Sequence, residues 1–540
     1  MSSAWLLIVA IAGFIIAYIF YGRFIAKRIG LERDRPTPAH TMNDGVDYMP
    51  AKAPVLLGHH FASIAGAAPI IGPVIAAVFG WIPVFLWIVL GGIFMGAVHD
   101  FTSLVASVRH QGRSIGEVIE EEIGERGKTF FLIFSWSTLI LVVAVFAIVV
   151  ANTFEQVPAA ASASVMFILV AVLFGIFLYR FNFPLPVLTV LGVLLLAGAL
   201  YLGYLYPLQL PAKSWLYILL GYIFVASVAP VWVLLQPRDY LNSFILYALM
   251  GLAVAGIFFV HPDIQLPTFT TFHVDRLGYM FPILFVTVAC GAISGFHSLV
   301  SSGTTAKQLN RETDARMVGF GSMLVESVLA VVALISAAVL LHDRYTELLI
   351  VNGKVNPVNL FSTSLASIFT EMGIDFRAGK AFVSLAVSAF ALTSLDTATR
   401  LSRFAMQEFF HKKGLKDEEQ SVMFRNRYIT TAVCVAVAAI LIFSGHGMSI
   451  WPIFGSANQL LAALALLSVT VWLTRNRRGN LFVRIPMVLM FIIALSALAV
   501  MIYKNFSDGK IMLAVIAVIL FVFAIFLVLE TRRSLKESGS

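Results

Sequence analysis

Nine ionisable side chains lie inside segments of this 540-residue chain that are otherwise apolar, and they are its best candidates for chemistry. A charge in an apolar segment is costly unless it meets a partner or lines a cavity. Histidine titrates near neutral pH and aspartate can share its proton, so this set favours proton handling. The nine are His59, His60, His99, Asp100, Asp239, His297, Glu326, Asp396 and Arg400.

Two other interpretations of these side chains stay open. Histidine and aspartate also suit zinc, which makes His59, His99 and Asp100 an alternative metal-ligand set, although the sequence has no helical His-x3-His pair. Each histidine could instead satisfy a backbone carbonyl, and Asp239 could close a tight cytoplasmic turn. A purely structural role explains Asp100 and Asp396 less well, because a lone buried carboxylate needs a partner.

The composition places these residues in a membrane. Hydrophobic residues make up 59% of the chain and charged residues 12%, whereas an ordinary soluble domain has about 45–50% and about 25%. These values exclude a soluble enzyme and a disordered chain. The two cysteines, Cys290 and Cys434, both lie in apolar runs and cannot form a disulfide framework or a four-thiolate zinc site. We therefore expect an all-α polytopic membrane protein.

A helix that crosses the bilayer needs about 20 mostly apolar residues, and about 15 segments meet that requirement. The first lacks the basic start and the cleavage site of a signal peptide, so we expect it to be retained. The predicted spans are 4–21, 53–79, 82–106, 129–154, 161–179, 185–206, 215–236, 241–260, 279–302, 316–341, 380–409, 428–444, 450–474, 483–503 and 511–530.

The distribution of basic residues predicts the orientation. If the loops after odd-numbered spans are cytoplasmic, they and the adjoining helix ends hold 29 of the 37 Lys and Arg residues. The positive-inside rule then places the N-terminus outside and the C-terminus in the cytoplasm. The basic excess is thus a topology signal, and we expect no nucleic-acid partner.

Three predicted spans contain glycine, proline, serine and histidine where an unbroken apolar helix would exclude them. Backbone groups freed inside hydrocarbon must be satisfied by protein or by a cavity. Close helix packing explains Gly91, Gly92 and Gly96, but it does not explain the two prolines and two histidines of the second span. The three stretches are 58–73 in the second span, 290–305 in the ninth and 451–459 at the start of the thirteenth.

The second and ninth spans share the pattern Gly-x-His-x5-Gly and enter the membrane from opposite sides. Interrupted helices in corresponding positions of two inverted halves indicate a transporter's binding site near the middle of the membrane. We expect the substrate to bind His60, Ser63, Gly66, Ser294, Gly295, His297, Ser298, Asp396 and Asn458. We expect proton coupling or gating by His59, His99, Asp100 and Glu326.

These motifs resemble the carbon starvation protein A family of prokaryotic inner-membrane transporters, over about residues 45 to 475. The most specific stretch is 58–73, from Gly58-His59-His60 to Gly72-Pro73. The others are Val98-His99-Asp100-Phe101, Gln236-Pro237-Arg238-Asp239-Tyr240, Ser294-Gly295-Phe296-His297-Ser298, Ser394-Leu395-Asp396-Thr397-Ala398-Thr399-Arg400 and Phe454-Gly455-Ser456-Ala457-Asn458-Gln459-Leu460-Leu461-Ala462.

The resemblance implies nutrient uptake in carbon-starved cells, with peptides as substrates in most members, pyruvate in some, and protons as the coupling ion. It also implies a LeuT-like inverted-repeat core with two discontinuous helices and extra peripheral helices. Six spans separate the broken helices, where a plain five-plus-five core has four, so we expect an inserted helix pair. The predicted parts are 1–52, a first half 53–278, an inverted second half 279–475 and two peripheral spans in 476–540.

We therefore expect a carrier, not an enzyme, in the prokaryotic inner membrane. It would need no cofactor, and zinc is the one alternative. A channel or membrane sensor that uses the same helices without coupled transport is the second hypothesis, and an intramembrane metalloenzyme is the third. ATP-driven pumping is disfavoured because the sequence has no glycine-rich phosphate loop.

Overall fold

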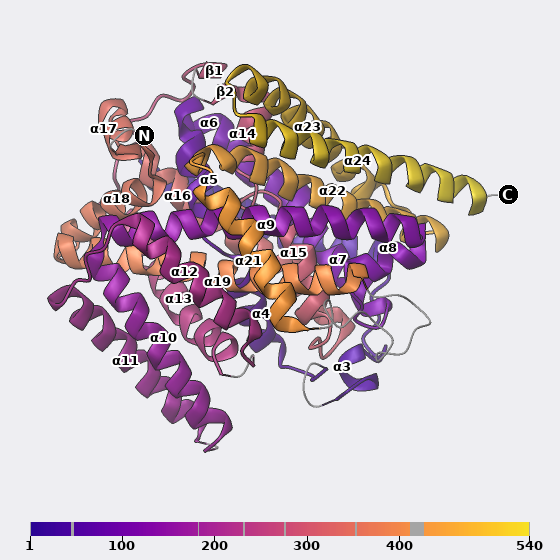
Figure 1. The fold of residues 1–540 in the computed structure, drawn as a ribbon, viewed down its shortest axis with the longest axis horizontal. Helices are drawn as coiled ribbons and strands as arrows, with labels where there is room; N and C mark the ends of the chain where they lie inside the picture. Colours follow the sequence, from indigo (N-terminus) through magenta and orange to yellow (C-terminus); the bar gives the residue numbers. More distant parts are fainter. Residues whose placement is uncertain are drawn as a thin grey trace.

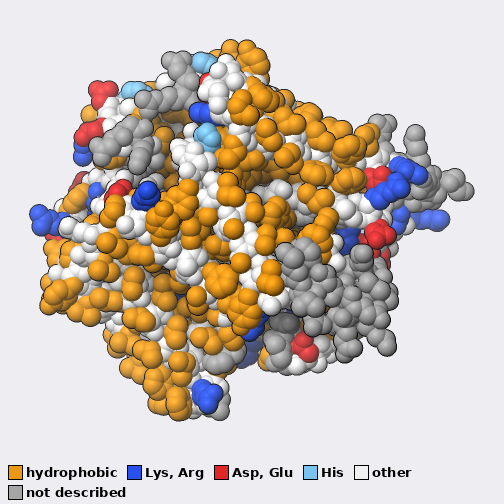
Figure 2. Space-filling model, viewed as in Figure 1, with side chains coloured by type: hydrophobic (Ala, Val, Ile, Leu, Met, Phe, Trp, Pro, Cys, Tyr) orange, Lys and Arg blue, Asp and Glu red, His pale blue; other side chains and the backbone are white. Residues whose placement is uncertain are grey.

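The computed structural model describes residues 2–44, 48–181, 183–230, 233–274, 277–351, 354–410 and 426–538, and within them it is almost entirely helical (Figure 1). Eleven helical stretches of these residues are long and apolar enough to cross a membrane, and a bent pair makes a twelfth. Figure 2 shows hydrophobic side chains over most of the face in view, with charged side chains gathered toward its ends. The molecule is thus an all-α, multi-pass membrane protein.

The N-terminal part of the chain contains the helices α1 to α13. They are α1 Ser3–Ile16, α2 Gly22–Ile29, α3 Pro38–Thr41, α4 Ala53–Ile64, α5 Ala68–Ala76, α6 Trp81–Leu86, α7 Ala97–Arg109, α8 Ile115–Ile123, α9 Glu125–Gln156, α10 Pro158–Tyr179, α11 Leu185–Leu205, α12 Ala212–Val228 and α13 Leu235–Val260. The short 3-10 helix Ala77–Phe79 follows α5.

The rest of the chain contains two small antiparallel hairpins as well as helices. The strands are β1 His273–Val274 with β2 Gly278–Tyr279, and β3 Ile350–Val351 with β4 Lys354–Val355. The helices are α14 Met280–Thr287, α15 Phe296–Val300, α16 Ser322–Ala338, α17 His342–Leu349, α18 Pro357–Glu371, α19 Phe376–Phe410, α21 Arg427–Phe443, α22 Trp451–Arg475, α23 Leu481–Ser507 and α24 Ile511–Ser538. The 3-10 helices Glu312–Asp314 and Gly447–Ile450 precede two of them.

Among the described residues four segments are π-helical, with backbone hydrogen bonds that span one more residue than those of an α-helix. They are Ala17–Tyr21, Trp87–Gly96, Ser301–Thr305 and Arg316–Gly321. The last three directly adjoin α7, α15 and α16. Short π-helical segments are rare and concentrate at functional sites.

The second span is interrupted as predicted. Its two halves, Ala53–Ile64 and Ala68–Phe79, meet at a bend of 49°. Ala65 leaves the helical conformation, and α5 begins again with Pro69 in its first turn, where the missing amide hydrogen costs no helical bond. The ninth span is more strongly broken, because residues 288–295 form no helix between α14 and α15.

The thirteenth span differs from expectation. The motif Trp451 to Gln459 lies inside one continuous helix, α22, because Pro452 falls in its first turn, where proline does not disturb the hydrogen bonds. The predicted count of fifteen is also not established. The seventh and twelfth predicted spans correspond to α12 and α21, of 17 residues each, and the ninth is broken into pieces.

The apolar spacing of residues 356–372 predicts an external helix that lies on the membrane surface, but the structure places this segment, α18, inside the protein. Leu360, Phe361 and Leu365 of α18 are fully buried, and α18 packs against α5, α16 and α19. Its apolar spacing therefore faces other helices. The glutamate-rich stretch 114–126 predicts a short acidic surface helix, and α8 forms within it. The N-terminus of α8 is capped by the Ser114 hydroxyl, which accepts a hydrogen bond from the Glu117 amide at 3.2 Å.

Three long helices form the centre of the molecule. The membrane-length stretches that contain α9, α19 and α22 are mostly buried inside the protein, and α9 packs along both of the others. The two termini lie on opposite sides of the molecule in Figure 1. The broken spans are held against this centre, since α15 contacts α22 and α4 contacts α19.

Candidate functional site

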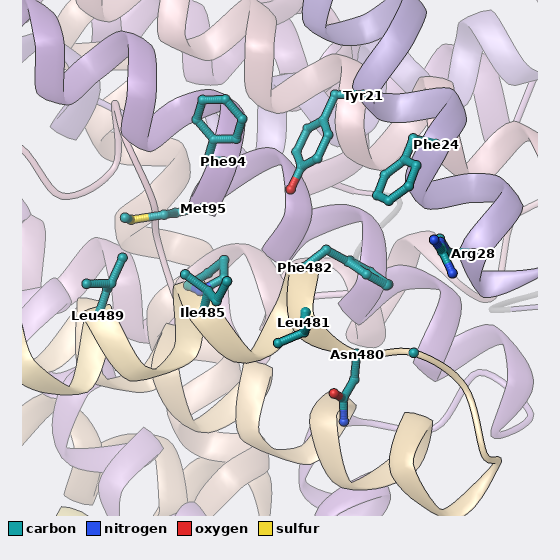
Figure 3. Close-up of a pocket in the computed structure, with 12 residues that line it drawn as sticks. Tyr21, Phe24, Arg28, Phe94, Met95, Asn480, Leu481, Phe482, Ile485 and Leu489 are labelled. Atoms are coloured by element: carbon teal, nitrogen blue, oxygen red, sulfur yellow. The ribbon is translucent and has the colours of Figure 1, made fainter.

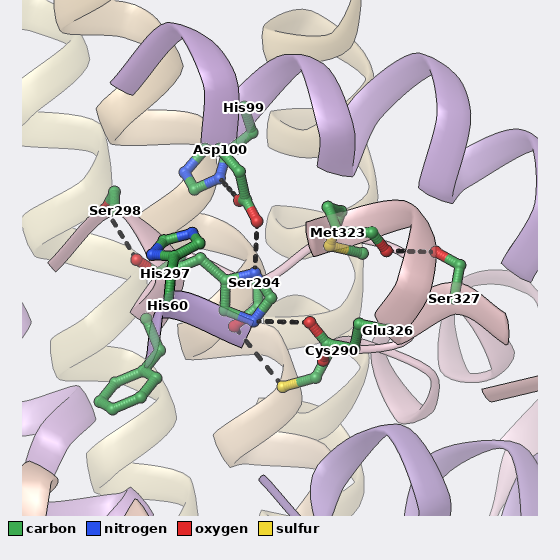
Figure 4. Close-up of polar contacts among 12 residues, drawn as sticks. His60, His99, Asp100, Cys290, Ser294, His297, Ser298, Met323, Glu326 and Ser327 are labelled. Atoms are coloured by element: carbon green, nitrogen blue, oxygen red, sulfur yellow. Dashed lines mark hydrogen bonds and ion pairs between the residues drawn. The ribbon is translucent and has the colours of Figure 1, made fainter. Parts of the chain in front are cut away.

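A chain of four buried ionisable side chains links α7, α15 and α16, and we call it the first cluster (Figure 4). The two carboxylate oxygens of Asp100 lie 2.7 and 2.8 Å from the Nδ1 atoms of His99 and His297, respectively. His297 Nε2 lies 3.3 Å from Glu326 Oε2. All four side chains are fully buried. Three helices that are far apart in the sequence thus share one connected set of protonatable groups.

Each helix of the first cluster has a π-helical segment beside it. Trp87–Gly96 precedes His99 and Asp100, Ser301–Thr305 follows His297, and Arg316–Gly321 precedes Glu326. An α-helix that changes into a π-helix within one span alters the direction of the side chains beyond the change. The three spans are therefore irregular just where they bring the cluster together.

His60 extends the polar region toward α4. Its Nδ1 lies 2.8 Å from the Thr305 hydroxyl, whereas its Nε2 has no hydrogen-bond partner among the described residues, and neither does the Nε2 of His99. The neighbouring His59 faces elsewhere, because its charged neighbour is Asp239, while those of His60 are Asp100 and His297. The two consecutive histidines thus differ in the charged side chains that lie near them.

The interruption of the ninth span is closed by α22. Asn458 accepts a hydrogen bond from the Phe296 amide on its side-chain oxygen at 2.9 Å and donates to the Ser294 hydroxyl at 3.0 Å. Its backbone oxygen also accepts from the Gly295 amide at 3.0 Å. These amides had been expected to bind a substrate. In this conformation protein groups occupy them instead.

The carbonyl side of the same interruption is satisfied in the same way. The Trp87 indole donates to the oxygens of Phe285 and Val288, at 3.2 and 3.0 Å. Trp451 donates to the Thr287 oxygen at 3.3 Å and Gln459 to the Phe285 oxygen at 2.6 Å. Because hydrocarbon offers no partner to a free carbonyl, these three side chains make the break possible inside a membrane.

Glycines let three helices approach the broken backbone directly. A Cβ atom on Gly72, Gly96 or Gly455 would lie 2.5, 2.3 or 2.0 Å from the carbonyl oxygens of Thr287, Ala292 or Val286. Such distances are impossible for a side chain, so these positions exclude alanine without movement. Close packing, which we had considered as the alternative role of the glycines, is therefore the role of those that surround the ninth span.

The shared pattern Gly-x-His-x5-Gly does not mark equivalent positions. In the second span the interruption follows His60, with Gly66 in it, whereas in the ninth it precedes His297 and ends at Gly295. Both interruption glycines are crowded: a Cβ on Gly66 would lie 2.2 Å from the Ser394 hydroxyl, and one on Gly295 would lie 2.4 Å from the Ala462 nitrogen. Gly66 and Gly295 thus each lie in an interruption and each pack closely against another helix.

A second cluster, formed by Tyr222, Arg238, Asp239 and Asp396, joins α12, α13 and α19. The Arg238 guanidinium is 1% exposed; it contacts Asp396 through Nη1 and Asp239 through Nη2, the latter at 3.1 Å. The Tyr222 hydroxyl donates to Asp396 at 2.7 Å. Asp396 was expected in the substrate site with His297, but it lies in this separate cluster.

The sequence interpretation missed Arg238 and Tyr222. Arg238 had been assigned to a cytoplasmic loop, and Asp239 to a tight turn, because Pro237 precedes them. In the structure Pro237 stands in the first turn of α13 and both charged residues lie inside that helix. The signal that could have identified them is their charge balance: a buried Asp396 requires a cation, and Arg238 and Arg400 were the available cations.

The remaining predicted binding residues make local contacts. The Ser63 hydroxyl donates to the His59 oxygen at 2.8 Å and the Ser298 hydroxyl to the Gly295 oxygen at 2.7 Å. In the described parts of the chain, no group of three or more His, Cys, Asp or Glu side chains is arranged to hold a metal ion. The predicted ligand set of His59, His99 and Asp100 is thus not assembled.

A pocket lies away from both clusters. It has a volume of about 460 Å³ and lies between α23, α2 and the π-helical segment before α7 (Figure 3). Its lining is mainly apolar and includes Phe24, Phe94 and Ile485. The first cluster, by contrast, is closely packed in this conformation.

A histidine–carboxylate pair, His110 and Glu122, is separate from both clusters and lies just outside the span Trp81–Arg109. His110 places Nδ1 2.6 Å from the Ala106 oxygen and Nε2 3.3 Å from a Glu122 oxygen. Burial disfavours the charged ring, but the hydrogen bond to Glu122 and the nearby carboxylates outweigh it and raise the pKa of His110 above its usual value. Next to it, Arg109 binds Glu312 at 2.7 Å.

Comparison with known proteins identifies the family. The sequence profile described as Carbon starvation protein CstA matches residues 2–354 and 347–497. The chain is 35% identical to the peptide transporter CstA of Campylobacter jejuni, over 89% of this chain and 77% of that protein. It is 33% identical to the pyruvate/proton symporter BtsT of Escherichia coli, over 88% of this chain and 78% of that protein.

Among solved structures, a mutant of the manganese transporter of Eremococcus coleocola aligns with 91% of this chain and 99% of its own, with a TM-score of 0.45 and 11% sequence identity. The profile covers nearly the whole chain, and the sequence relatives are transporters of small solutes. The motifs that suggested the resemblance all lie within the matched residues. This chain therefore belongs to the carbon starvation protein CstA family of membrane transporters.

Proposed function

We propose that this transporter is a secondary carrier that imports a small solute with a carboxylate, a peptide or pyruvate, together with protons. The observation that carries the proposal is the first cluster, in which His99, Asp100, His297 and Glu326 are connected and fully buried. Ionisable residues at membrane depth mark proton and substrate pathways. The names of the relatives, a peptide transporter and a pyruvate/proton symporter, support both solutes and the proton.

The hydrogen bonds of the first cluster indicate where the transported proton would reside. An ionised Asp100 accepts a hydrogen bond from the Nδ1 of each of its two histidines, which fixes the protons on those nitrogens. His297 Nε2 and Glu326 face one another at 3.3 Å, and an attractive contact there requires one additional proton on either group. The cluster can therefore exist with and without this proton, as a symporter requires.

We propose that alternating access takes place around the second and ninth spans, in a LeuT-like inverted-repeat core with an inserted helix pair. The matched interruptions at Gly66 and Gly295 support this arrangement. In the same proposal the halves are 53–278 and 279–475, with 1–52 and 476–540 outside the core. When the carrier opens, Asn458 and its neighbours would release the ninth span.

We also propose that the protein resides in the inner membrane of a prokaryote, with its N-terminus outside and its C-terminus in the cytoplasm. The excess of basic residues in the loops after odd-numbered spans supports this orientation. Termini on opposite sides of the molecule are consistent with an odd number of crossings (Figure 1). Cysteine labelling of the two ends from each side of the membrane would test it.

The decisive experiment is uptake into proteoliposomes of labelled alanyl-alanine and labelled pyruvate, with and without an inward pH gradient. We expect at least one solute to accumulate above its external concentration only when the gradient is present. Downhill flux that never becomes concentrative would support the channel hypothesis and contradict symport. Flux of neither solute would contradict the proposed substrate class.

We propose that transport needs no cofactor. Zinc at His59, His99 and Asp100 is the alternative, although these three side chains are not brought together in this conformation. Elemental analysis of the purified protein tests it. Stoichiometric zinc that disappears in His99→Ala would favour the metal site. We expect instead no stoichiometric metal and no effect of chelators on uptake.

A further inference from the structure

The second cluster contains a guanidinium that is placed to bind an anion. Arg238 is fully enclosed by α12, α13 and α19, and its Nη1 atom contacts both Asp396 and the Tyr222 hydroxyl, the latter at 2.7 Å. Arg238 and Asp396 are 158 residues apart in the chain. Arginine is always charged and presents a rigid fork of donors that matches a carboxylate.

We propose that Arg238 binds the carboxylate of the transported solute, and that Asp396 is the resident counter-ion that the solute displaces. The inference rests on the proposed function and names the residue that recognises the feature shared by peptides and pyruvate. In the solute-free state the carboxylate of Asp396 occupies the place that the solute carboxylate takes on binding. Tyr222 donates its hydrogen bond to whichever carboxylate is present.

Buried polar atoms without a hydrogen-bond partner support the binding of a ligand at the second cluster. Arg238 Nε and Asp396 Oδ1 are buried and have no hydrogen-bond partner among the described residues, and the same is true of Asn242 Oδ1 one turn further along α13. A buried polar atom without a partner is costly. Native proteins keep few such atoms, and three around one ion pair indicate that a bound molecule or water completes the site.

The charges of the second cluster favour an anion that arrives together with a proton. The cluster holds one cation, Arg238, and two anions, Asp239 and Asp396. Arg400 lies nearby and donates to the backbone oxygens of Ala226 and Ala229 at the end of α12, and its own charged neighbours include Arg403 and Arg427. A solute carboxylate would add one uncompensated negative charge in a buried region. The proton that the proposed symport carries with the solute restores neutrality.

The second cluster also lies beside the moving part of the proposed carrier. Ser394, two residues before Asp396, contacts Gly66 in the interruption of the second span, and α4 packs against both α13 and α19. Asp239 is the charged neighbour of His59 on α4. A change in the bend of the second span would therefore alter the enclosure of Arg238.

The test is equilibrium binding of labelled pyruvate and labelled alanyl-alanine to the purified full-length protein, with pyruvamide and alanyl-alanine amide as uncharged competitors. For the wild type we expect the free carboxylates to compete much better than the amides. The double variant Arg238→Gln/Asp396→Asn removes both charges of the fully buried pair together and leaves only Asp239, whose side chain is 11% exposed, without its guanidinium, so we expect it to fold. We expect it to weaken carboxylate binding roughly ten- to hundred-fold and to lose the preference over the amide.

The single variant Asp396→Asn separates binding from a structural role. Since it removes the competitor of the solute, we expect pyruvate to bind several-fold more tightly than to the wild type. Unchanged carboxylate affinity in the double variant, or weaker binding in Asp396→Asn, would overturn the inference. Arg344→Gln, which removes an exposed guanidinium paired with Glu347, is the matched control and should leave binding unchanged. A wild type that binds neither solute would contradict the proposed function itself.

Discussion

The first cluster is fully buried and the second surrounds the buried pair of Arg238 and Asp396. Both join three helices, yet they differ in what can happen to their charge. The first cluster is built from two histidines and two carboxylates, all of which can gain or lose a proton. The second is organised around Arg238, which stays cationic at every accessible pH. A membrane transporter can thus keep a site of variable charge apart from a site of fixed charge, the former suited to protons and the latter to an anion.

The largest effect should come from Asp100→Asn. The asparagine side chain keeps the shape but can no longer act as a charged acceptor for both histidines, so the additional proton would not be held. We expect acid-driven accumulation of solute to fall to the level without a gradient, while exchange of labelled for unlabelled solute persists. Concentrative uptake by this variant would remove Asp100 from the coupling mechanism and the contrast between the clusters with it.

The next effect concerns stability and should be specific to the second cluster. Asp396→Ala leaves the Arg238 guanidinium buried without its main counter-ion, and we expect a loss of about 3–5 kcal/mol in the free energy of unfolding. Thermal or denaturant unfolding in detergent measures it. Most of the loss should be recovered when Arg238→Gln is added. A destabilisation that the second substitution does not relieve would mean that Asp396 acts through contacts other than the ion pair.

A smaller effect should follow from a substitution that disturbs the packing around the ninth span but leaves both clusters intact. Gly455→Ala would place a methyl group 2.0 Å from the Val286 oxygen, and overpacking of this kind costs about 1–3 kcal/mol. We expect lower thermal stability and slower uptake, with the pH dependence of uptake retained. Gly198→Ala on α11, which has nothing within 4 Å of its Cβ position, is the control and should behave as the wild type does.

The smallest effect should come from His110, which offers histidine–carboxylate chemistry outside the membrane spans. The folded protein raises the pKa of this ring through Glu122. The contribution of the pair to stability is therefore complete below the pKa of the unfolded ring, about 6.5, and disappears as the pH rises through the higher folded value. We expect unfolding curves to show a decline of less than about 1 kcal/mol across this range.

His110→Gln should remove that pH dependence and leave the rest of the stability profile unchanged. An unaltered decline in this variant would assign the titration to another group. His110 and His297 both contact a glutamate, but His110 lies outside the membrane spans whereas His297 lies in the broken ninth span. Of the two, only His297 belongs to the first cluster, where we propose that the transported proton resides.

Composition and hydropathy predicted the membrane class, and the glycine and proline content predicted the broken second and ninth spans. The partners of the buried charges could not be predicted, since they come from distant parts of the chain: Asp100 and His297 are 197 residues apart. Pro237 made Arg238 look like a loop residue although proline is equally suited to the first turn of a helix. The amphipathic spacing of α18 was the same that a membrane-surface helix would have, and only packing against α5 and α19 distinguishes the two.

The π-helical segments beside α7, α15 and α16 have a mechanical consequence. Each holds a surplus residue that an α-helix would expel, and moving this surplus by one turn rotates the side chains it passes by about 100° without displacing either end of the helix. His99, His297 and Glu326 lie within one to two turns of these segments. Such a twist would change which groups these three side chains face while the ends of the helices stay in place.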